Sequence, residues 1–250
     1  MQKANIVVIA SEGLTTNLLA ERLSAHMNVT KVFIETAESK TMILKRRRKR
    51  LGFLKTAGQV LFMTLALPFV KSRKNRISQI IQQYSLSGKT IDSELIQRIN
   101  TVHDAELVQA IEKENPTLIF INGTRILKKT LLDKINCPIV NIHVGITPKY
   151  RGVHGGYWAV HNKDLAHFGV TLHLVDAGID TGQVIAQKVI SPEKEDNFKT
   201  YPVLQYCNGL DLISENFEGL LSGELKTVRP ITDESQLHYH PTLWEFWTGS

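Results

Sequence analysis

An amide, an imidazole and a carboxylate occur within one stretch of the chain, from Asn141 to Asp180. Asn141 and His143 end an apolar run that begins at Pro138. Because side chains alternate between the two faces of an extended strand, Asn141 and His143 point the same way. Asp180 lies in a glycine-flanked loop between two strand-like runs. If the two strand ends are neighbours in the fold, the three side chains meet.

This set of side chains suits the transfer of a group to or from a carbonyl carbon. An asparagine amide donates a hydrogen bond to the oxyanion that develops in the transition state. A histidine supplies a second donor or moves a proton. An aspartate fixes the histidine or accepts the proton of the attacking group. Each residue alone has an ordinary explanation, as a strand end, a buried histidine or a turn residue, but their order together with the glycines favours a site.

The order of the motifs resembles the formyltransferase family that uses 10-formyltetrahydrofolate. That family includes glycinamide ribonucleotide transformylase, methionyl-tRNA formyltransferase and the sugar N-formyltransferases. The resemblance is carried by three motifs, N-x-H, P-K-Y-R-G and V-D-A-G-I-D-T-G, at Asn141-x-His143, residues 148–152 and residues 175–182. It is good over about residues 112 to 190 and poor between 36 and 90 and beyond 225.

The resemblance implies an α/β fold with a doubly wound, mostly parallel, Rossmann-like sheet, and it implies roles for individual residues. The expected co-substrate is 10-formyltetrahydrofolate, and no metal is expected. The residues expected to be catalytic are Asn141, His143 and Asp180. Those expected to bind the folate are Arg125, Ile126, Leu127, Asp176 and Gly178. Those expected to contact the acceptor substrate are Ser11, Gly13, Lys149, Tyr150, Arg151 and His173.

Several of these roles have alternatives. Ile126 and Leu127 also fit the first turn of a helix that faces the core, and His173 also fits a satisfied core histidine. The turn at Ser11–Gly13 has a single glycine, so it is either a phosphate-binding turn or a plain connection. Family members often have a serine two residues after the motif histidine, where this chain has Gly145. We therefore expect a changed loop and a changed acceptor specificity.

The pattern of the chain predicts the elements that position these residues. The opening is a buried strand, a turn and a helix, which is typical of a doubly wound sheet. Helices are also predicted at 104–114 and 155–162, with Asp104 as the N-cap of the first. The predicted strands are 5–10, 32–34, 118–121, 137–143, 169–175 and 183–190, and a single helix is predicted at 200–221.

A basic stretch separates the second predicted strand from the helix predicted at 104–114. From Ser39 to Ile91 there are thirteen Lys or Arg and no Asp or Glu, whereas the rest of the chain carries seventeen basic and twenty-four acidic residues, a net charge of −7. Its apolar run at 56–70 is shorter than the roughly 20 residues of a spanning helix. We expect a basic amphipathic insertion at about 39–85, the basic segment. Residues 45–76 of this segment have three candidate partners: an anionic membrane surface, the rest of the domain, or a second subunit. Nucleic acid is disfavoured because no base-reading pattern accompanies the charge.

Composition places the remaining limits. The chain has 250 residues, 42% of them apolar, enough for one domain with a core. Two cysteines and an opening without a signal-peptide pattern predict a cytoplasmic protein, with possible association at the cytoplasmic membrane face. We expect a catalytic domain at 1–225, containing the basic segment, and an aromatic tail at 226–250. His238-x-His240 in the tail is poor evidence for a metal site.

The predicted function is transfer of a formyl group from 10-formyltetrahydrofolate to a primary amine, on a nucleotide- or lipid-linked amino sugar. Glycinamide ribonucleotide is an alternative acceptor, and water would make the protein a formyltetrahydrofolate deformylase. Methionyl-tRNA is disfavoured because few residues follow Ile190 for the extra domain of that enzyme. A homodimer is possible, and a membrane or partner-binding module without catalysis is the alternative of another class.

Overall fold

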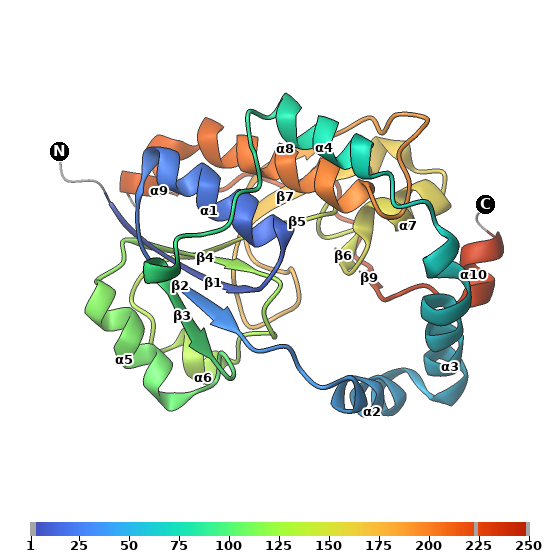
Figure 1. Ribbon diagram of the computed structural model, residues 1–250, viewed down its shortest axis with the longest axis horizontal. Helices are drawn as coiled ribbons and strands as arrows, with labels where there is room; N and C mark the ends of the chain where they lie inside the picture. The colour runs from blue at the N-terminus through green and yellow to red at the C-terminus, as the bar shows by residue number, and fades with distance from the viewer. Residues whose placement is uncertain (1–3, 223–224, 249–250) are drawn as a thin grey trace.

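A seven-stranded sheet forms the centre of the molecule, in the order β3-β2-β1-β4-β5-β7-β8 (Figure 1). The computed structural model describes residues 4–222 and 225–248. Neighbouring strands from β3 to β5 pair in parallel, β7 runs antiparallel to β5, and β8 runs antiparallel to β7. The strands are β1 (Asn5–Ser11), β2 (Asn28–Glu35), β3 (Ile96–Ile99), β4 (Leu118–Asn122), β5 (Ile139–His143), β7 (Gly169–Leu174) and β8 (Val184–Val189). The predicted mostly parallel sheet is confirmed.

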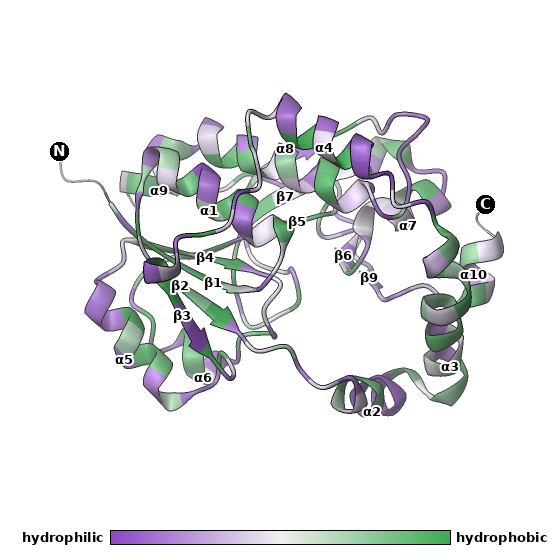
Figure 2. Ribbon diagram, in the orientation of Figure 1, coloured by the Kyte–Doolittle hydropathy of each residue, from purple (hydrophilic) through white to green (hydrophobic). Residues whose placement is uncertain are grey.

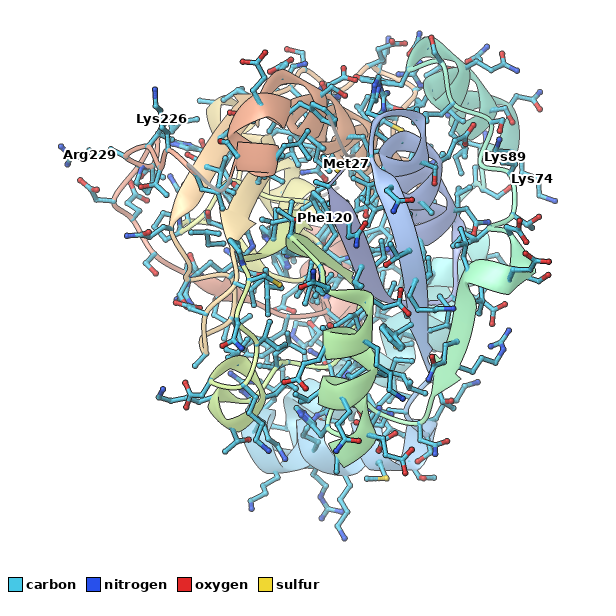
Figure 3. All side chains as sticks on the ribbon, turned by 90° about the vertical axis from the view of Figure 1, so that its left-hand side faces the viewer. Met27, Lys74, Lys89, Phe120, Lys226 and Arg229 are labelled. Carbon is cyan, nitrogen blue, oxygen red and sulfur yellow. The ribbon has the colours of Figure 1, made fainter. Side chains whose placement is uncertain are left out.

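Helices cover both faces of this sheet, because the central strand is apolar on both sides. In β1, Ile6 and Val8 face one core cluster and Val7 and Ile9 face the other. The first cluster is closed by α1 (Leu14–His26), α4 (Lys74–Gln83), α8 (Tyr201–Glu215) and α9 (Phe217–Ser222), and the second by α5 (Ala105–Glu114) and α6 (Lys129–Leu132). Figure 3 shows Met27 and Phe120 inside the molecule and Lys89 and Arg229 at its surface.

One predicted helix needs correction, and one predicted N-cap position is confirmed. The single helix predicted at 200–221 is two helices, because Asn216 ends α8. Its side-chain amide donates to the carbonyl of Leu212 at 2.8 Å, a local bond that competes with helix continuation. Asp104 is at the N-cap position of α5, but its carboxylate accepts from the amide of Thr101 and makes no capping bond within the helix.

The basic segment is helical and begins at the carboxyl end of β2. It contains α2 (Lys40–Leu51), α3 (Phe53–Leu61), a π-helical turn (Phe62–Ala66), a 3-10 turn (Leu67–Phe69) and then α4. Gly52, with a φ of 82°, lets the chain turn sharply between α2 and α3. In Figure 1, α2 and α3 form an arm beside the sheet, and α4 returns across α8.

The basic segment is anchored to the C-terminal half of the chain. Phe62 is fully buried and packs against the rings of Phe198 and Phe246. Phe246 belongs to α10 (Leu243–Thr248), the last helix. The guanidinium of Arg76 donates two hydrogen bonds of 3.0 Å to the fully buried carboxylate of Asp196. One face of the segment is therefore part of the core.

The buried ion pair should be a large local contribution to stability. We expect Arg76→Met to lower the free energy of unfolding by about 3–5 kcal/mol, because it leaves the Asp196 carboxylate buried without a counter-charge. Urea denaturation followed by circular dichroism measures this loss. The matched control is Arg98→Met, which removes the exposed pair with Glu12 and should leave the midpoint unchanged. Equal losses in the two variants would contradict an anchoring role for Arg76.

Candidate active site

The amide of Asn141 is held by a histidine on the next strand. Antiparallel pairing of β5 and β7 places Asn141 directly opposite His173. The side-chain nitrogen of Asn141 lies 3.2 Å from Nε2 of His173, and Nδ1 of His173 lies 2.7 Å from the carbonyl of Leu174. A carbonyl only accepts, so Nδ1 carries the proton and Nε2 accepts from Asn141. Burial and then the nearby His143 lower the pKa of His173, which keeps this ring neutral.

This arrangement fixes the orientation of the Asn141 amide. One N–H of the amide donates to His173, so the nitrogen and oxygen of the group cannot exchange places without losing the bond. The second N–H remains for another acceptor. His173 therefore positions Asn141 in this geometry, whereas the sequence assigned it either to the acceptor or to the core.

The buried ring of His143 lies between two acceptors. Nε2 donates to the backbone carbonyl of Tyr150 at 2.7 Å, and Nδ1 lies 3.3 Å from Oδ2 of Asp180. A carbonyl only accepts, so Nε2 carries a proton, and the other ring nitrogen faces the carboxylate. The close fit depends on Gly145, since a Cβ there would lie 2.8 Å from Nε2 of His143 and 2.6 Å from the Tyr150 carbonyl. Gly145 thus permits the bond that orients the histidine.

The carboxylate of Asp180 joins the two histidines to a third piece of chain. Oδ2 accepts from the backbone amide of Gly152 at 2.8 Å, and Oδ1 lies 3.8 Å from Nε2 of His173. Asp180 has a φ of 50°, in the left-handed region that Asp and Asn tolerate better than most residues. Asn141, His143, His173 and Asp180 therefore come together at the carboxyl end of β5.

The loop that carries Asp180 is held by residues that the sequence assigned to ligands. Oδ1 of Asp176 accepts from the amide of Gly178 at 3.0 Å and from the hydroxyl of Thr181 at 2.7 Å. Arg151 donates to the carbonyl of Ile179 at 3.1 Å. The polar groups of Asp176 and Arg151 thus serve the shape of the loop, and the structure gives a reason for both residues that needs no ligand.

The loop after β4 lies next to Asn141, because Ile121 and Asn141 are partners in the sheet. Arg125 is not free there: its guanidinium donates to buried Glu35 at 2.6 Å, and its amide donates to the same carboxylate at 2.9 Å. The Leu127 side chain is buried in the second core cluster. The protein itself occupies these two side chains, so the predicted folate role of Arg125 and Leu127 falls to their backbone groups and stays a prediction.

Ile126 differs from its two neighbours. Its side chain is 52% exposed, and within the described residues neither Ile126 nor Leu127 forms a hydrogen bond through its backbone N–H or C=O. Ile126 is also outside any helix, since α6 begins only at Lys129. An exposed apolar side chain beside unpaired peptide groups fits a flat heterocycle that is read by backbone hydrogen bonds. Glu35, which holds this loop through Arg125, was missed from sequence because it is the last residue of an apolar strand.

The acceptor residues Lys149 and Tyr150 are also engaged. The ammonium group of Lys149 lies 3.0 Å from both Asp164 and Glu234, and these hydrogen bonds raise its pKa. Tyr150 is 1% exposed, and its hydroxyl donates to Asp164 at 2.8 Å. The predicted side-chain contact of Tyr150 with substrate is therefore wrong, and its contribution to the site is the carbonyl that holds His143.

The turn before α1 is open. Gly13 is the N-cap residue of α1, no side chain caps it, and no atom lies within 4 Å of a Cβ built there. The carbonyl of Ser11 accepts from the hydroxyl of Thr16 at 2.6 Å, which orders the turn. Free amides at a helix N-terminus suit an anion, so the predicted role of Ser11 and Gly13 stays a prediction.

A sizeable cavity lies elsewhere in the molecule. It has a volume of about 810 Å³ and is lined by His26, Phe217 and neighbours at the ends of α1 and α8. These helix ends lie at the amino-terminal edge of the parallel strands, away from Asn141 and Asp180. The site is therefore identified by its convergent side chains and not by this cavity. Within residues 4–222 and 225–248, no group of three His, Cys, Asp or Glu side chains is placed to hold a metal ion.

Two histidines of the tail and His154 pack next to the site. β9 (Leu237–His238) pairs in parallel with β6 (Arg151–Gly152), the strand whose Gly152 holds Asp180. His238 stacks on Tyr150, with ring centroids 5.1 Å apart. His240 is 2.9 Å from His154, the residue before α7 (Gly155–His161). His154 was not predicted, and its only sequence signal is the pair of glycines after it.

The comparisons with known proteins concern the family and the fold. A family model described as "Formyl transferase" matches residues 4–202. A methionyl-tRNA formyltransferase from Levilactobacillus brevis is 31% identical over 152 residues, which are 61% of this chain and 48% of that protein. The chain spans about half the length of the curated relatives it matches.

Solved structures share the fold. A phosphoribosylglycinamide formyltransferase from Streptococcus pneumoniae TIGR4 is 23% identical, with a TM-score of 0.55, and the match covers 87% of this chain and 98% of that one. A sugar N-formyltransferase from Shewanella sp FDAARGOS_354 is 15% identical, with a TM-score of 0.58, covering 98% and 86%. The predicted Rossmann-like arrangement is confirmed by these likenesses.

Acid should destabilise the protein through three buried histidines, His154, His238 and His240. Burial lowers the pKa of His154 to about 3 and those of His238 and His240 to about 4. Below the ordinary value of about 6.5 the unfolded chain binds more protons than the folded chain, so stability is lost as the pH falls. We expect a loss of about 1.4 kcal/mol for each histidine between pH 7.5 and 5.5, measured by urea denaturation.

The control for this prediction is the difference between two variants. His238→Gln removes one of the three buried histidines and should reduce the loss between the two pH values by about a third. His26→Gln changes an exposed histidine and should retain the full loss. Parallel pH curves for the parent protein and His238→Gln would contradict the assignment.

Proposed function

The chain belongs to the formyl transferase family, and from this premise we propose that it transfers a formyl group from 10-formyltetrahydrofolate to a primary amine. One observation carries the proposal: the carboxylate of Asp180 lies 3.3 Å from the ring of His143, at the strand end that also presents Asn141. An amide donor, an imidazole and a carboxylate are the groups that attack on a carbonyl carbon requires.

The formyl donor would lie against the loop after β4. The exposed side chain of Ile126 offers an apolar surface, and the unpaired peptide groups of Ile126 and Leu127 offer donors and acceptors for a pterin. Glu35 and Arg125 fix the loop in place through hydrogen bonds of 2.6 and 2.9 Å. Because Ile121 pairs with Asn141, the loop and the catalytic side chains share one edge of the sheet. The donor supplies the formyl carbon that the amine attacks.

Asn141 and His143 stabilise the charge that develops on the formyl oxygen. The free N–H of the Asn141 amide is available because His173 takes the other one. His143 is held beside the formyl oxygen in one orientation, with Nε2 bonded to the Tyr150 carbonyl and Nδ1 facing Asp180. Removal of one such donor typically costs about 2.7–4 kcal/mol of transition-state stabilisation.

Asp180 moves the proton. The amine loses a proton as its nitrogen bonds to the formyl carbon, and Asp180 accepts it directly or through water. The proton then goes to the folate nitrogen as its bond to the formyl carbon breaks, so the products are an N-formyl amine and tetrahydrofolate. The amide of Gly152 and the ring of His143 hold Oδ2 of Asp180 and leave Oδ1 facing His173.

The acceptor we propose is an amino sugar attached to a nucleotide or lipid carrier. Lys149 and Arg151 already bond to protein groups, so recognition of a phosphorylated carrier would fall to other cations. The basic segment supplies them, since β2 leads directly into it at the edge where the catalytic groups lie. Arg50 and Lys55 lie over the ring of Tyr239, which directly follows β9.

Replacement of Asp180 tests the mechanism. We expect Asp180→Asn to lower kcat about 10²–10⁴-fold, because asparagine keeps the shape and accepts the left-handed backbone but cannot take a proton. Release of tetrahydrofolate in the presence of an amine acceptor gives the rate. Asp133→Asn, at an exposed ion pair with Lys129, is the matched control and should keep full activity. Unchanged activity in Asp180→Asn would remove this carboxylate from the mechanism.

A panel of acceptors tests the substrate. Tetrahydrofolate release should be stimulated by nucleotide-linked amino sugars and remain at background with glycinamide ribonucleotide, methionyl-tRNA or no amine. Turnover of glycinamide ribonucleotide or methionyl-tRNA alone would overturn the sugar assignment and keep the transferase. Release without any amine, at the same rate as with one, would indicate a hydrolase. Absence of release under every condition would favour a binding module.

A further inference from the structure

The arm of the basic segment exposes large apolar side chains that a solvated helix does not need. Phe53 is 67% exposed, Leu54 77% and Phe69 83%, and Leu61 and Leu65 are exposed as well. Apolar residues gathered in this way on a soluble protein mark an interaction site. Figure 2 shows the hydrophobic colouring of α3 and the mixed colouring of α2 beside it.

The exposed apolar residues of α3 and the turn after it lie opposite the packed ones. Leu54, Leu61 and Leu65 recur at spacings of seven and four, so they share one side of the helix. Gln59 and Phe62 are on the other side, where Gln59 donates to the carbonyl of His240 at 2.8 Å and Phe62 is in the core. One side of the arm therefore packs against the protein, and the opposite side is exposed.

The last helix adds two tryptophans to this region. Gly58 of α3 is in contact with the ring of Trp244, and both Trp244 and Trp247 of α10 are exposed. We name the whole set the arm surface: Phe53, Leu54, Leu61, Leu65, Phe69, Trp244 and Trp247. Amphipathic rings of this kind are favoured where an apolar phase meets water.

Positive charge borders the arm surface. Lys45 to Arg50 are six successive cations on α2, a helix that buries no residue. Within the described residues, only Arg46 among the six forms an ion pair, with Glu38 at 2.7 Å. Lys45 and Lys49, like Arg46 and Arg50, are like charges at i and i+4, which repel each other. A surface of negative charge would relieve this repulsion.

We propose that the arm surface and the cations of α2 dock this protein on an anionic lipid leaflet, with the arm lying in the plane of the membrane. Apolar side chains enter the acyl boundary, and the cations contact the anionic headgroups. Phosphate-backbone binding would use the cations but leave Phe53, Leu54 and Phe69 without a partner. An isologous contact with a second copy would bring the two runs of cations close to each other.

The anchoring contacts favour an arm that lies on the membrane rather than one that crosses it. No single described helix is long and apolar enough to span, whereas Phe53–Phe69 and Lys74–Gln83 pass that test only as a pair bent by 87°. Phe62 and the Arg76–Asp196 pair hold this same stretch to the protein core. The arm begins at the carboxyl end of β2, so docking turns the catalytic edge of the sheet toward the leaflet.

Vesicle binding by the full chain tests the proposal, independently of catalysis. We expect co-sedimentation with phosphatidylcholine vesicles that contain a quarter phosphatidylglycerol, weak binding to pure phosphatidylcholine, and loss of binding in high salt. Trp158 is buried, so a blue shift of tryptophan emission on binding would report Trp244 and Trp247. Lack of binding to the phosphatidylglycerol vesicles would overturn the proposal.

Two triple variants separate the contributions, since every changed side chain is exposed. Lys45→Gln, Arg48→Gln and Lys49→Gln together should weaken the vesicle partition coefficient about hundredfold, at about fivefold for each cation. The matched control is Lys113→Gln, Lys128→Gln and Lys134→Gln, three exposed lysines outside the basic segment, which should bind as the parent does.

Phe53→Ser, Leu54→Ser and Phe69→Ser should weaken binding at least tenfold and abolish the blue shift, whereas Leu165→Ser and Ile231→Ser, at exposed positions elsewhere, should not. Equal binding by both triple variants and their controls would overturn the proposal. A change of molar mass in the serine triple without lipid, measured by light scattering, would indicate a second copy and would also overturn the proposal. RNA binding that depends on the three apolar side chains would do the same.

Discussion

The carboxylate of Asp180 contacts residues from three different strands. His143 comes from the end of β5, Gly152 from the short strand β6, and His173 from β7. Each contact restrains a different part of the site, and none lies close to the others in sequence. Because the residue has left-handed backbone geometry, the loop fixes where the carboxylate points before any partner is considered. Catalytic geometry here is thus a property of loop closure on a rigid sheet.

The tail and the basic segment brace this loop from outside. β9 pairs with β6, so the strand that offers the Gly152 amide is held on its other side by the tail. Gln59 of the basic segment bonds to His240 just beyond β9, and His240 in turn bonds to His154. A contiguous set of contacts therefore runs from the arm to the Asp180 carboxylate. The basic segment, which resembles the family least in sequence, therefore contributes contacts that hold the site in place.

Sequence reasoning found what local rules determine and missed what depends on contacts between distant residues. The meeting of Asn141, His143 and Asp180 followed from strand alternation and from the position of loops at one sheet edge, which are local rules. Tyr150 was assigned to the acceptor, yet its side chain is buried and its carbonyl holds His143, and a backbone role leaves no mark on residue type. Arg125 was assigned to the folate through the family resemblance, and its bond to Glu35, ninety positions away, could not be foreseen from local pattern. The break at Asn216 was missed because apolar spacing continues across it.

The local features of α2 show why its charged surface is ready before any partner arrives. Ser39 caps the helix by accepting from the amide of Met42, and Arg48, Lys49 and Arg50 occupy the last turn, where the helix dipole favours cations. Lysine, arginine and leucine are good helix formers, so repulsion within the run is offset locally. The helix buries no residue, so its order rests on this cap, on the charges of its last turn and on its contact with α3. A surface that is already ordered avoids the entropy loss of folding on contact, so its charge and apolar area act directly in binding.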